Sequence, residues 1–248
     1  MAVPPKDHNR KKRKKLFFLH LIGNLLILFS IFGVAATFGP ALYYEAKFQI
    51  SRAFRIEYFV SDSPKGTTGF GRIIAEIERQ NPNAQESLFA SIINGEKQKI
   101  LVPVSAQFSV VIPKIGANEN VYSNVDPSKE EEYLNVLRYG IAHAKGTAFP
   151  GVNGTTYLFA HSADNFWQVG RYNATFYLLN KMEKGDEVIL FYNGVRHDYL
   201  VTETKIVEAT DTHYIDSKLG EGEKVILQTC WPPGTAWKRL LVFAKPKK

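Results

Sequence analysis

An uncharged stretch close to the N-terminus, residues 16–44, limits the possible folds of this chain more than any other segment. Its 29 residues include no Asp, Glu, Lys or Arg. About 20 apolar residues are enough to cross the hydrocarbon core of a bilayer as a helix. The sequence therefore predicts one transmembrane helix over residues 16–44, and the remaining chain must fold in water outside the bilayer.

The charges around this stretch predict its orientation. Of the net charge of +7, residues 1–15 contribute +6, through seven Lys or Arg and one Asp. Positive residues flanking a membrane helix are retained in the cytoplasm. We therefore expect a single-pass protein of the cell membrane, with residues 1–15 as a basic cytoplasmic tail and the chain after Tyr44 outside the cytoplasm.

A cleaved signal peptide is the alternative interpretation, but the apolar core of a signal peptide spans only about 7–15 residues. The charge distribution also argues against a nucleic-acid partner. Beyond residue 15 the chain carries 24 basic and 23 acidic residues, whereas nucleic-acid-binding domains present a basic patch.

Near the C-terminus, the only cysteine of the chain, Cys230, ends the apolar run of residues 225–230. A turn-rich segment follows, and Arg239 then opens a second apolar run over residues 240–244. Two β-like runs joined by a loop rich in Pro and Gly are typical of neighbouring strands. If these strands pair, a thiol and a guanidinium lie near the same end of one sheet.

A cysteine nucleophile needs a base or a cationic neighbour, because its free pKa is about 8.5. An arginine stays protonated and can only donate hydrogen bonds, for example to an oxyanion. Among the six histidines, His161 ends the run of residues 155–160 and precedes a turn, where catalytic groups tend to lie. The alternative for Cys230 is a small buried hydrophobic side chain, the commonest fate of a free cysteine.

His161, Cys230 and Arg239, in this order, resemble the catalytic triad of the sortases, the cysteine transpeptidases of the bacterial cell surface. The segment Leu-Gln-Thr-Cys230 is similar to their TLxTC signature, with Ile226 at the position of its threonine. Residues 143–151 resemble the family's H-x-x-G-T-A-x-P-G motif, and residues 112–115 resemble a motif early in the domain. The resemblance covers residues 102–245 and places His143 outside the triad.

The resemblance implies a mainly β fold, a sortase-type eight-stranded β-barrel with short helical insertions, preceded here by one transmembrane helix. It also implies a reaction. Cys230 would cleave a C-terminal LPxTG-like sorting motif of a surface protein through a thioester. The acyl group would pass to an amine of a cell-wall precursor or of another surface protein. His161 and Arg239 would complete the catalytic site, and Thr229 and Trp231 would contact the substrate.

The remaining patterns divide the chain into a tail (1–15), a transmembrane helix (16–44), a stalk and helical appendage (45–101) and a catalytic domain (102–248). Helical spacing of isoleucines and leucines predicts two short helices within residues 73–93. Strands are expected at residues 101–115, 155–161, 187–192, 197–209, 224–230 and 239–244, and helices at residues 127–139 and 174–182.

Two other classes of function remain open from the residues alone. One is a membrane-anchored extracytoplasmic cysteine peptidase, although papain-like enzymes carry Cys before His, the reverse of the order here. The other is a non-enzymatic surface β-domain with an inert Cys230. We expect no cofactor and no metal site. The acidic run Glu130-Glu131-Glu132 is interpreted as the solvated start of a helix.

Overall fold

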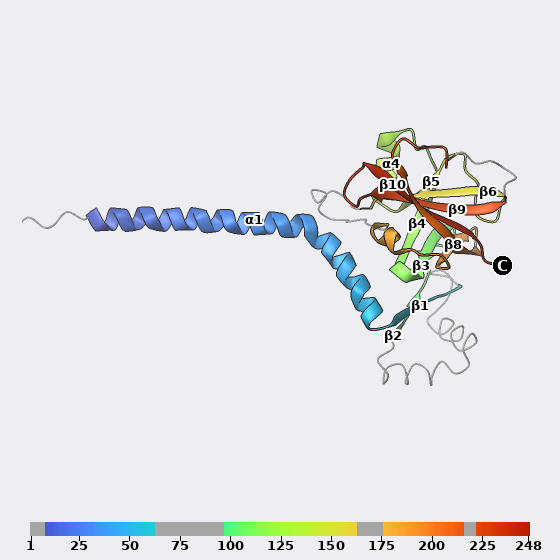
Figure 1. The fold of residues 1–248 in the computed structure, drawn as a ribbon, viewed down its shortest axis with the longest axis horizontal. Coiled ribbons are helices and arrows are strands. Elements are labelled where there is room, and N and C mark those ends of the chain that lie inside the picture. The colour runs from blue at the N-terminus through green and yellow to red at the C-terminus, as the bar shows by residue number, and fades with distance from the viewer. Residues whose placement is uncertain (1–7, 63–96, 163–175, 216–221) are drawn as a thin grey trace, which may run out of the picture. The chain divides into compact units, whose positions relative to one another are not determined.

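The computed structural model describes residues 8–62, 97–162, 176–215 and 222–248. The chain divides into two compact units, residues 1–43 and residues 44–248. Helix α1 (His8–Ala53) begins in the first unit and ends in the second (Figure 1). Its segment Lys12–Ala35 has a mean hydropathy of 2.2. This segment is long and apolar enough to cross a membrane, which fits a membrane anchor.

The second unit contains a closed barrel of eight strands (Figure 1). The neighbours around the barrel are β10-β8-β7-β3-β4-β5-β6-β9. The strands are β3 (Phe108–Ile112), β4 (Ala117–Val125), β5 (Ile141–Ala144), β6 (Gly154–Phe159), β7 (Glu187–Tyr192), β8 (Val195–Glu208), β9 (Glu223–Trp231) and β10 (Lys238–Pro246). The mainly β, eight-stranded fold predicted from the sequence is confirmed.

The interior of the barrel is filled by one of the two side-chain faces that alternate along each strand. Val110 and Ile112 of β3, Leu158 of β6 and Leu227 of β9 belong to one buried cluster and are fully inaccessible to solvent. Burying side chains of this kind stabilises the fold by about 1.5–3 kcal/mol each.

The opposite face of β6, β9 and β10 carries a second apolar cluster on the outside of the barrel. Tyr157, Phe159, Ile226 and Leu241 are buried there. Helix α4 (Glu130–Leu137) covers them with Leu137 and Tyr133, and Tyr214 and Ile215, which follow β8, also pack against them. This side of the barrel therefore has a covered outer face, and that face carries the candidate site.

A small parallel sheet of β1 (Ile56–Val60) and β2 (Lys97–Leu101) lies against the barrel. Val60 and Leu101 pack on the buried side chains of Val111, Ile189 and Phe191.

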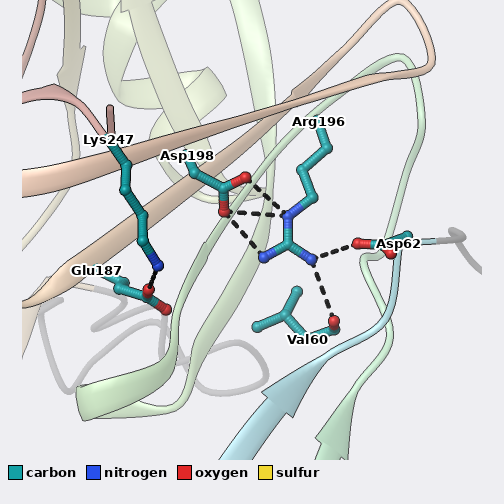
Figure 2. Close-up of polar contacts among 6 residues, drawn as sticks. All are labelled: Val60, Asp62, Glu187, Arg196, Asp198 and Lys247. Atoms are coloured by element: carbon teal, nitrogen blue, oxygen red, sulfur yellow. Dashed lines mark hydrogen bonds and ion pairs between the residues drawn. The ribbon is translucent and has the colours of Figure 1, made fainter. Parts of the chain in front are cut away.

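Figure 2 shows the polar contacts beside this packing, which centre on the guanidinium of Arg196. This group contacts both carboxylate oxygens of Asp198, the carboxylate of Asp62 and the backbone oxygen of Val60. Because Asp62 and Val60 lie at the end of β1, Arg196 joins that strand to the barrel.

Several local predictions differ from the structure. Residues 101–115 are not one strand: β2 ends at Leu101, β3 begins at Phe108, and Pro113–Ile115 form a 3-10 helix. The helix expected at residues 127–139 is shorter, because the carboxylate of Asp126 accepts hydrogen bonds from the amide and hydroxyl of Ser128 and holds these residues in a turn. The segment predicted as a helix at residues 174–182 is described as the 3-10 helix Tyr177–Lys181.

Strands β4 and β5 are absent from the sequence-based assignment. In β4 the buried residues are Ala117, Val121 and Val125, a spacing of four that does not show the two-residue alternation of a strand. β5 has only four residues, all buried. The helices predicted within residues 73–93 lie outside the described residues.

Candidate active site

Cys230 and Arg239 face each other across two paired strands. β9 and β10 are antiparallel, and Arg239 is the register partner of Cys230. Side chains opposite each other in an antiparallel pair have Cβ atoms about 4.5–5.5 Å apart. The connecting hairpin is closed by a turn in which Thr235 donates its amide (3.0 Å) and its hydroxyl (2.8 Å) to the backbone oxygen of Pro232.

His161 follows β6, which pairs in parallel with β9 up to Phe159 and Gln228. The pairing continues beyond the strand, because the amide of Ala160 donates to the oxygen of Gln228 (3.1 Å). The hydroxyl of Thr229 donates in turn to the oxygen of Ala160 (3.0 Å). These bonds hold the chain just before His161 alongside the residues just before Cys230.

The three residues predicted as catalytic line one cavity of about 430 Å³ on the outer face of the barrel. Its other walls come from α4, the end of β6, the segment after β8 and the β9–β10 hairpin. They include Glu130, Tyr133, Tyr157, Phe159, Ser162, Thr212, Ile215, Gln228, Thr235 and Ala236. A thiol, an imidazole and a guanidinium that share one half-enclosed space can supply a nucleophile, a base and an oxyanion donor.

The guanidinium of Arg239 is held by the hairpin that it belongs to. Its Nη1 donates to the backbone oxygens of Ala236 (3.0 Å) and Lys238 (3.1 Å). A guanidinium has five N–H donors in a planar fork. The two bonds of Nη1 therefore fix the plane of the fork and leave the donors on Nε and Nη2 for other partners.

Two cavity-lining residues, Tyr157 and Gln228, were not found by sequence reasoning. The Tyr157 hydroxyl donates to Oε1 of Gln228 at 2.5 Å. Burial raises the pKa of Tyr157, and the charge of Arg239 opposes this shift only in part. The available signal was Gln228 itself, a polar residue inside an apolar run and two positions before Cys230, hence on the same face of the strand.

Thr229 and Trp231 lie on the other face of β9. Thr229 is 2% exposed and donates to a backbone oxygen. Trp231 packs against the cluster inside the barrel and lines a separate depression with Lys205, Ile206 and Leu240. Neither residue lines the cavity that contains Cys230.

His143 is buried away from this cavity, in the H-x-x-G-T-A-x-P-G segment. Its Nε2 donates to the oxygen of Ala148 (3.0 Å), and its Nδ1 accepts from the amide of Asn124 (3.3 Å). Its ring stacks on Phe149 with centroids 4.5 Å apart. Burial lowers the pKa of His143, although the bond to Ala148 opposes the shift. A neutral imidazole with both nitrogens occupied organises the β5–β6 loop.

The structure shows why position 151 of the same segment is a glycine. Gly151 has a φ of 82°, and a Cβ placed on it would meet the ring of His197 at 2.6 Å. Only glycine fits this position without strain.

The acidic residues at the start of α4 do not form a cation site in the described part of the chain. No group of three or more His, Cys, Asp or Glu side chains there is arranged to hold a metal ion. Glu132 instead accepts from the amide of Asp126 (3.4 Å) and lies 3.6 Å from Lys129.

Together, fold and cavity define a β-barrel protein with a cysteine, a histidine and an arginine gathered on one covered outer face. Residues 110–247, more than half of the chain, match the sequence profile of the sortase domain. The chain therefore belongs to the sortase family. Members of this family are cysteine transpeptidases, and this protein is an enzyme of that type.

A curated relative, Sortase D of Bacillus subtilis (strain 168), is 27% identical over 176 residues, which cover 69% of this chain and 80% of the relative. Among solved structures, sortase C1 of Streptococcus agalactiae is 26% identical, with a TM-score of 0.47 over 57% of this chain and 66% of that one. The Sortase D5 transpeptidase of Clostridium perfringens is 22% identical, with a TM-score of 0.47 over 70% and 95% of the two chains.

Proposed function

We propose that this sortase cleaves a C-terminal LPxTG-like sorting motif of surface proteins through a thioester on Cys230. The acyl group then passes to an amine of a cell-wall precursor or of another surface protein. The observation that carries this proposal is the shared cavity of His161, Cys230 and Arg239, within the family profile that the chain matches.

In the first half-reaction, the Cys230 thiolate attacks the backbone carbonyl carbon of the threonine in the motif. Arg239 donates hydrogen bonds to the oxyanion of the tetrahedral intermediate. The C–N bond then breaks, and His161 gives a proton to the departing amine. The product is an acyl-thioester on Cys230, and the C-terminal fragment of the substrate leaves.

In the second half-reaction, the acceptor amine attacks the thioester carbonyl and gives a proton to His161. The C–S bond breaks, Cys230 is released as a thiolate, and a new amide bond joins the two partners. His161 loses a proton to the departing amine in the first half-reaction and regains one from the acceptor amine in the second, so the reaction requires no cofactor.

The anchoring proposed for the chain suits both partners. We assign residues 1–15 to the cytoplasm, residues 16–44 to the membrane, and residues 102–248 to an extracytoplasmic catalytic domain. We assign residues 45–101 to a stalk and helical appendage, whose strands β1 and β2 pack on the barrel. The asymmetry of basic residues supports this orientation. Substrates that end in a membrane-proximal sorting signal, and acceptors bound to lipid, would then lie on the same side of the same membrane.

The reaction is tested by incubating the purified chain in detergent with a peptide library of the form LPxTG. We expect wild type to gain a mass on Cys230 and to release the C-terminal fragment, while Cys230→Ala shows neither and remains folded. His161→Ala keeps the thiol open to slow alkylation but loses turnover.

The same assay separates the alternatives. If product forms only when an amine is added, the enzyme is a transferase. If the peptide is hydrolysed at the same rate with and without the amine, the enzyme is a cysteine peptidase. A thiol that reacts neither with the peptides nor with an alkylating reagent indicates a non-enzymatic β-domain. Transfer retained by Cys230→Ala would remove the covalent mechanism.

A further inference from the structure

Gln228 combines three features that make it a ligand for the bound peptide. It lines the same cavity as Cys230. It lies two positions before Cys230 on β9, so both side chains leave the same face of the strand. It is also polar, although its register partners Leu241 on β10 and Phe159 on β6 are apolar.

The Tyr157 hydroxyl sets the orientation of the Gln228 amide. Tyr157 is 2% exposed, and its hydroxyl donates to Oε1 of Gln228 at 2.5 Å. Burial raises the pKa of Tyr157, so the phenol remains a donor at neutral pH. With Oε1 occupied, the amide turns its Nε2 group away from Tyr157. Within the described residues, Nε2 donates no hydrogen bond.

The separation of Gln228 from Cys230 along β9 matches the two-residue repeat of an extended peptide. Two residues of an extended chain span about 6.6–6.8 Å, and carbonyls two residues apart point to the same side. Gln228 and Cys230 are separated by the same two-residue repeat of β9. A peptide that runs extended along β9 with its scissile carbonyl at Cys230 would therefore present another backbone carbonyl near Gln228.

We propose that Gln228 is a substrate-binding residue whose Nε2 donates to a backbone carbonyl of the sorting peptide, two residues from the scissile bond. Tyr157 is its positioning residue. This inference rests on the proposed function. Because the contact is to the peptide backbone, it contributes to the binding of any extended sorting peptide rather than to the choice of one side chain. The contact exists before and during bond cleavage, so it lowers KM without raising kcat.

The test uses the full chain in detergent, an LPxTG peptide library as donor and hydroxylamine as acceptor. The variants are Gln228→Met, which keeps the size but removes the donor, Tyr157→Phe, which removes only the hydroxyl, and the double variant. Tyr199→Phe is the matched control, because Tyr199 is 1% exposed and its hydroxyl also donates to a side chain, Glu223, outside the cavity. Gln107→Met is the control for the glutamine change on an exposed residue.

We expect Gln228→Met to raise KM about two- to tenfold, the range of one neutral hydrogen bond, with kcat unchanged. Tyr157→Phe should raise KM by a smaller factor, and it should add nothing in the Gln228→Met background, because the two residues act as one unit. Neither control should alter KM. Melting temperatures measured in parallel separate a loss of fold from a loss of binding.

The results that overturn the inference differ in what they remove. If wild type acylates Cys230 but Gln228→Met has the KM of Gln107→Met, the peptide contact is wrong while the proposed function stands. If Tyr157→Phe has the KM of Tyr199→Phe, or the two effects add in the double variant, the positioning role of Tyr157 is wrong. If wild type acylates Cys230 with no peptide of the library, the proposed function fails and this inference fails with it.

Discussion

The side chain of Arg239 is fixed before any substrate binds. Its Nη1 is occupied by two backbone oxygens of the β9–β10 hairpin, so the remaining donors of the planar fork keep one direction. Lysine carries the same charge on a flexible stem with a single ammonium group, and it cannot bind the hairpin and a substrate oxygen in this geometry.

We therefore predict that Arg239→Lys fails almost as badly as Arg239→Ala, with kcat reduced by about 10²–10³ in each. The measurement is single-turnover acylation of Cys230 with an LPxTG peptide. Substantial activity in Arg239→Lys would assign the role to charge alone. Near-normal turnover in Arg239→Ala would leave a two-residue site of His161 and Cys230.

His143 makes the stability of the fold depend on pH. Its pKa in the folded chain is lowered by burial, whereas the unfolded chain has a pKa of about 6.5. Between these two values the unfolded state binds more protons, so its free energy falls relative to the folded state as the pH decreases. The stabilisation is present above pH of about 6.5 and is lost as the pH falls through the folded pKa.

The free energy of unfolding should therefore decrease as the pH falls below about 6.5, the pKa of the unfolded chain. His143→Gln, which is neutral throughout this range, should be less stable at pH 7 but should lose less on acidification. Denaturant unfolding at a series of pH values measures both chains. Parallel pH profiles for the two proteins would contradict this assignment.

At the scale of elements, Arg196 adds polar contacts between the end of β1 and the barrel to the apolar packing of Val60 and Leu101. The guanidinium of Arg196, whose side chain is 28% exposed, binds Asp198 of the same strand and reaches Asp62 and the Val60 oxygen at the end of β1 (Figure 2). Burial works against the charge of Arg196, but the bonds to Asp198 and Asp62 outweigh it and raise its pKa.

Arg196→Met keeps an apolar stem but leaves Asp62 and the Val60 oxygen without this donor. We predict a loss of about 1–2 kcal/mol of stability, the lower range for charged hydrogen bonds because Asp62 is half exposed. Amide hydrogen exchange in β1 and β2 should increase more than in the barrel strands.

Lys247→Met is the matched control. Lys247 pairs with Glu187 close by, but both side chains are about half exposed, so no measurable change is expected. Equal effects of the two substitutions, or unchanged exchange in β1 for Arg196→Met, would show that apolar packing alone holds this sheet.

For the whole molecule, the distribution of charge predicts the side of the membrane on which the barrel lies. Protease added to intact spheroplasts should degrade the chain beyond Tyr44, while a tag on the N-terminus stays protected until the membrane is permeabilised. Protection of the C-terminal barrel in intact spheroplasts would mean that the orientation is reversed.

Much of this protein could be predicted from local sequence. The uncharged length of residues 16–44 predicts a long apolar helix, and α1 contains a segment that is long and apolar enough to cross a membrane. The strands β6, β7, β9 and β10 can be recognised in the sequence as apolar runs, because several successive side chains in each strand are buried. The order and spacing of the residues around Cys230 were specific enough to indicate the family, which the profile match confirms.

Other parts depended on contacts between distant segments. β4 has polar residues at most positions and is a strand because β3 and β5 pair with it. β1 and β2 are separated by more than thirty residues and meet only through parallel pairing. Local propensity does not encode partners of this kind, because the strand is stabilised by its neighbours rather than by its own sequence.

The candidate site shows the same division. The chemical groups could be identified from the sequence: a single thiol, with a histidine and an arginine at the ends of apolar runs. Their surroundings could be identified only in the folded chain, where Arg239 lies opposite Cys230, Thr229 and Trp231 lie on the other face of β9, and Tyr157 is bonded to Gln228. Side chains alternate between the two faces of a strand, so the register between strands determines which side chains lie on the same face and share a cavity.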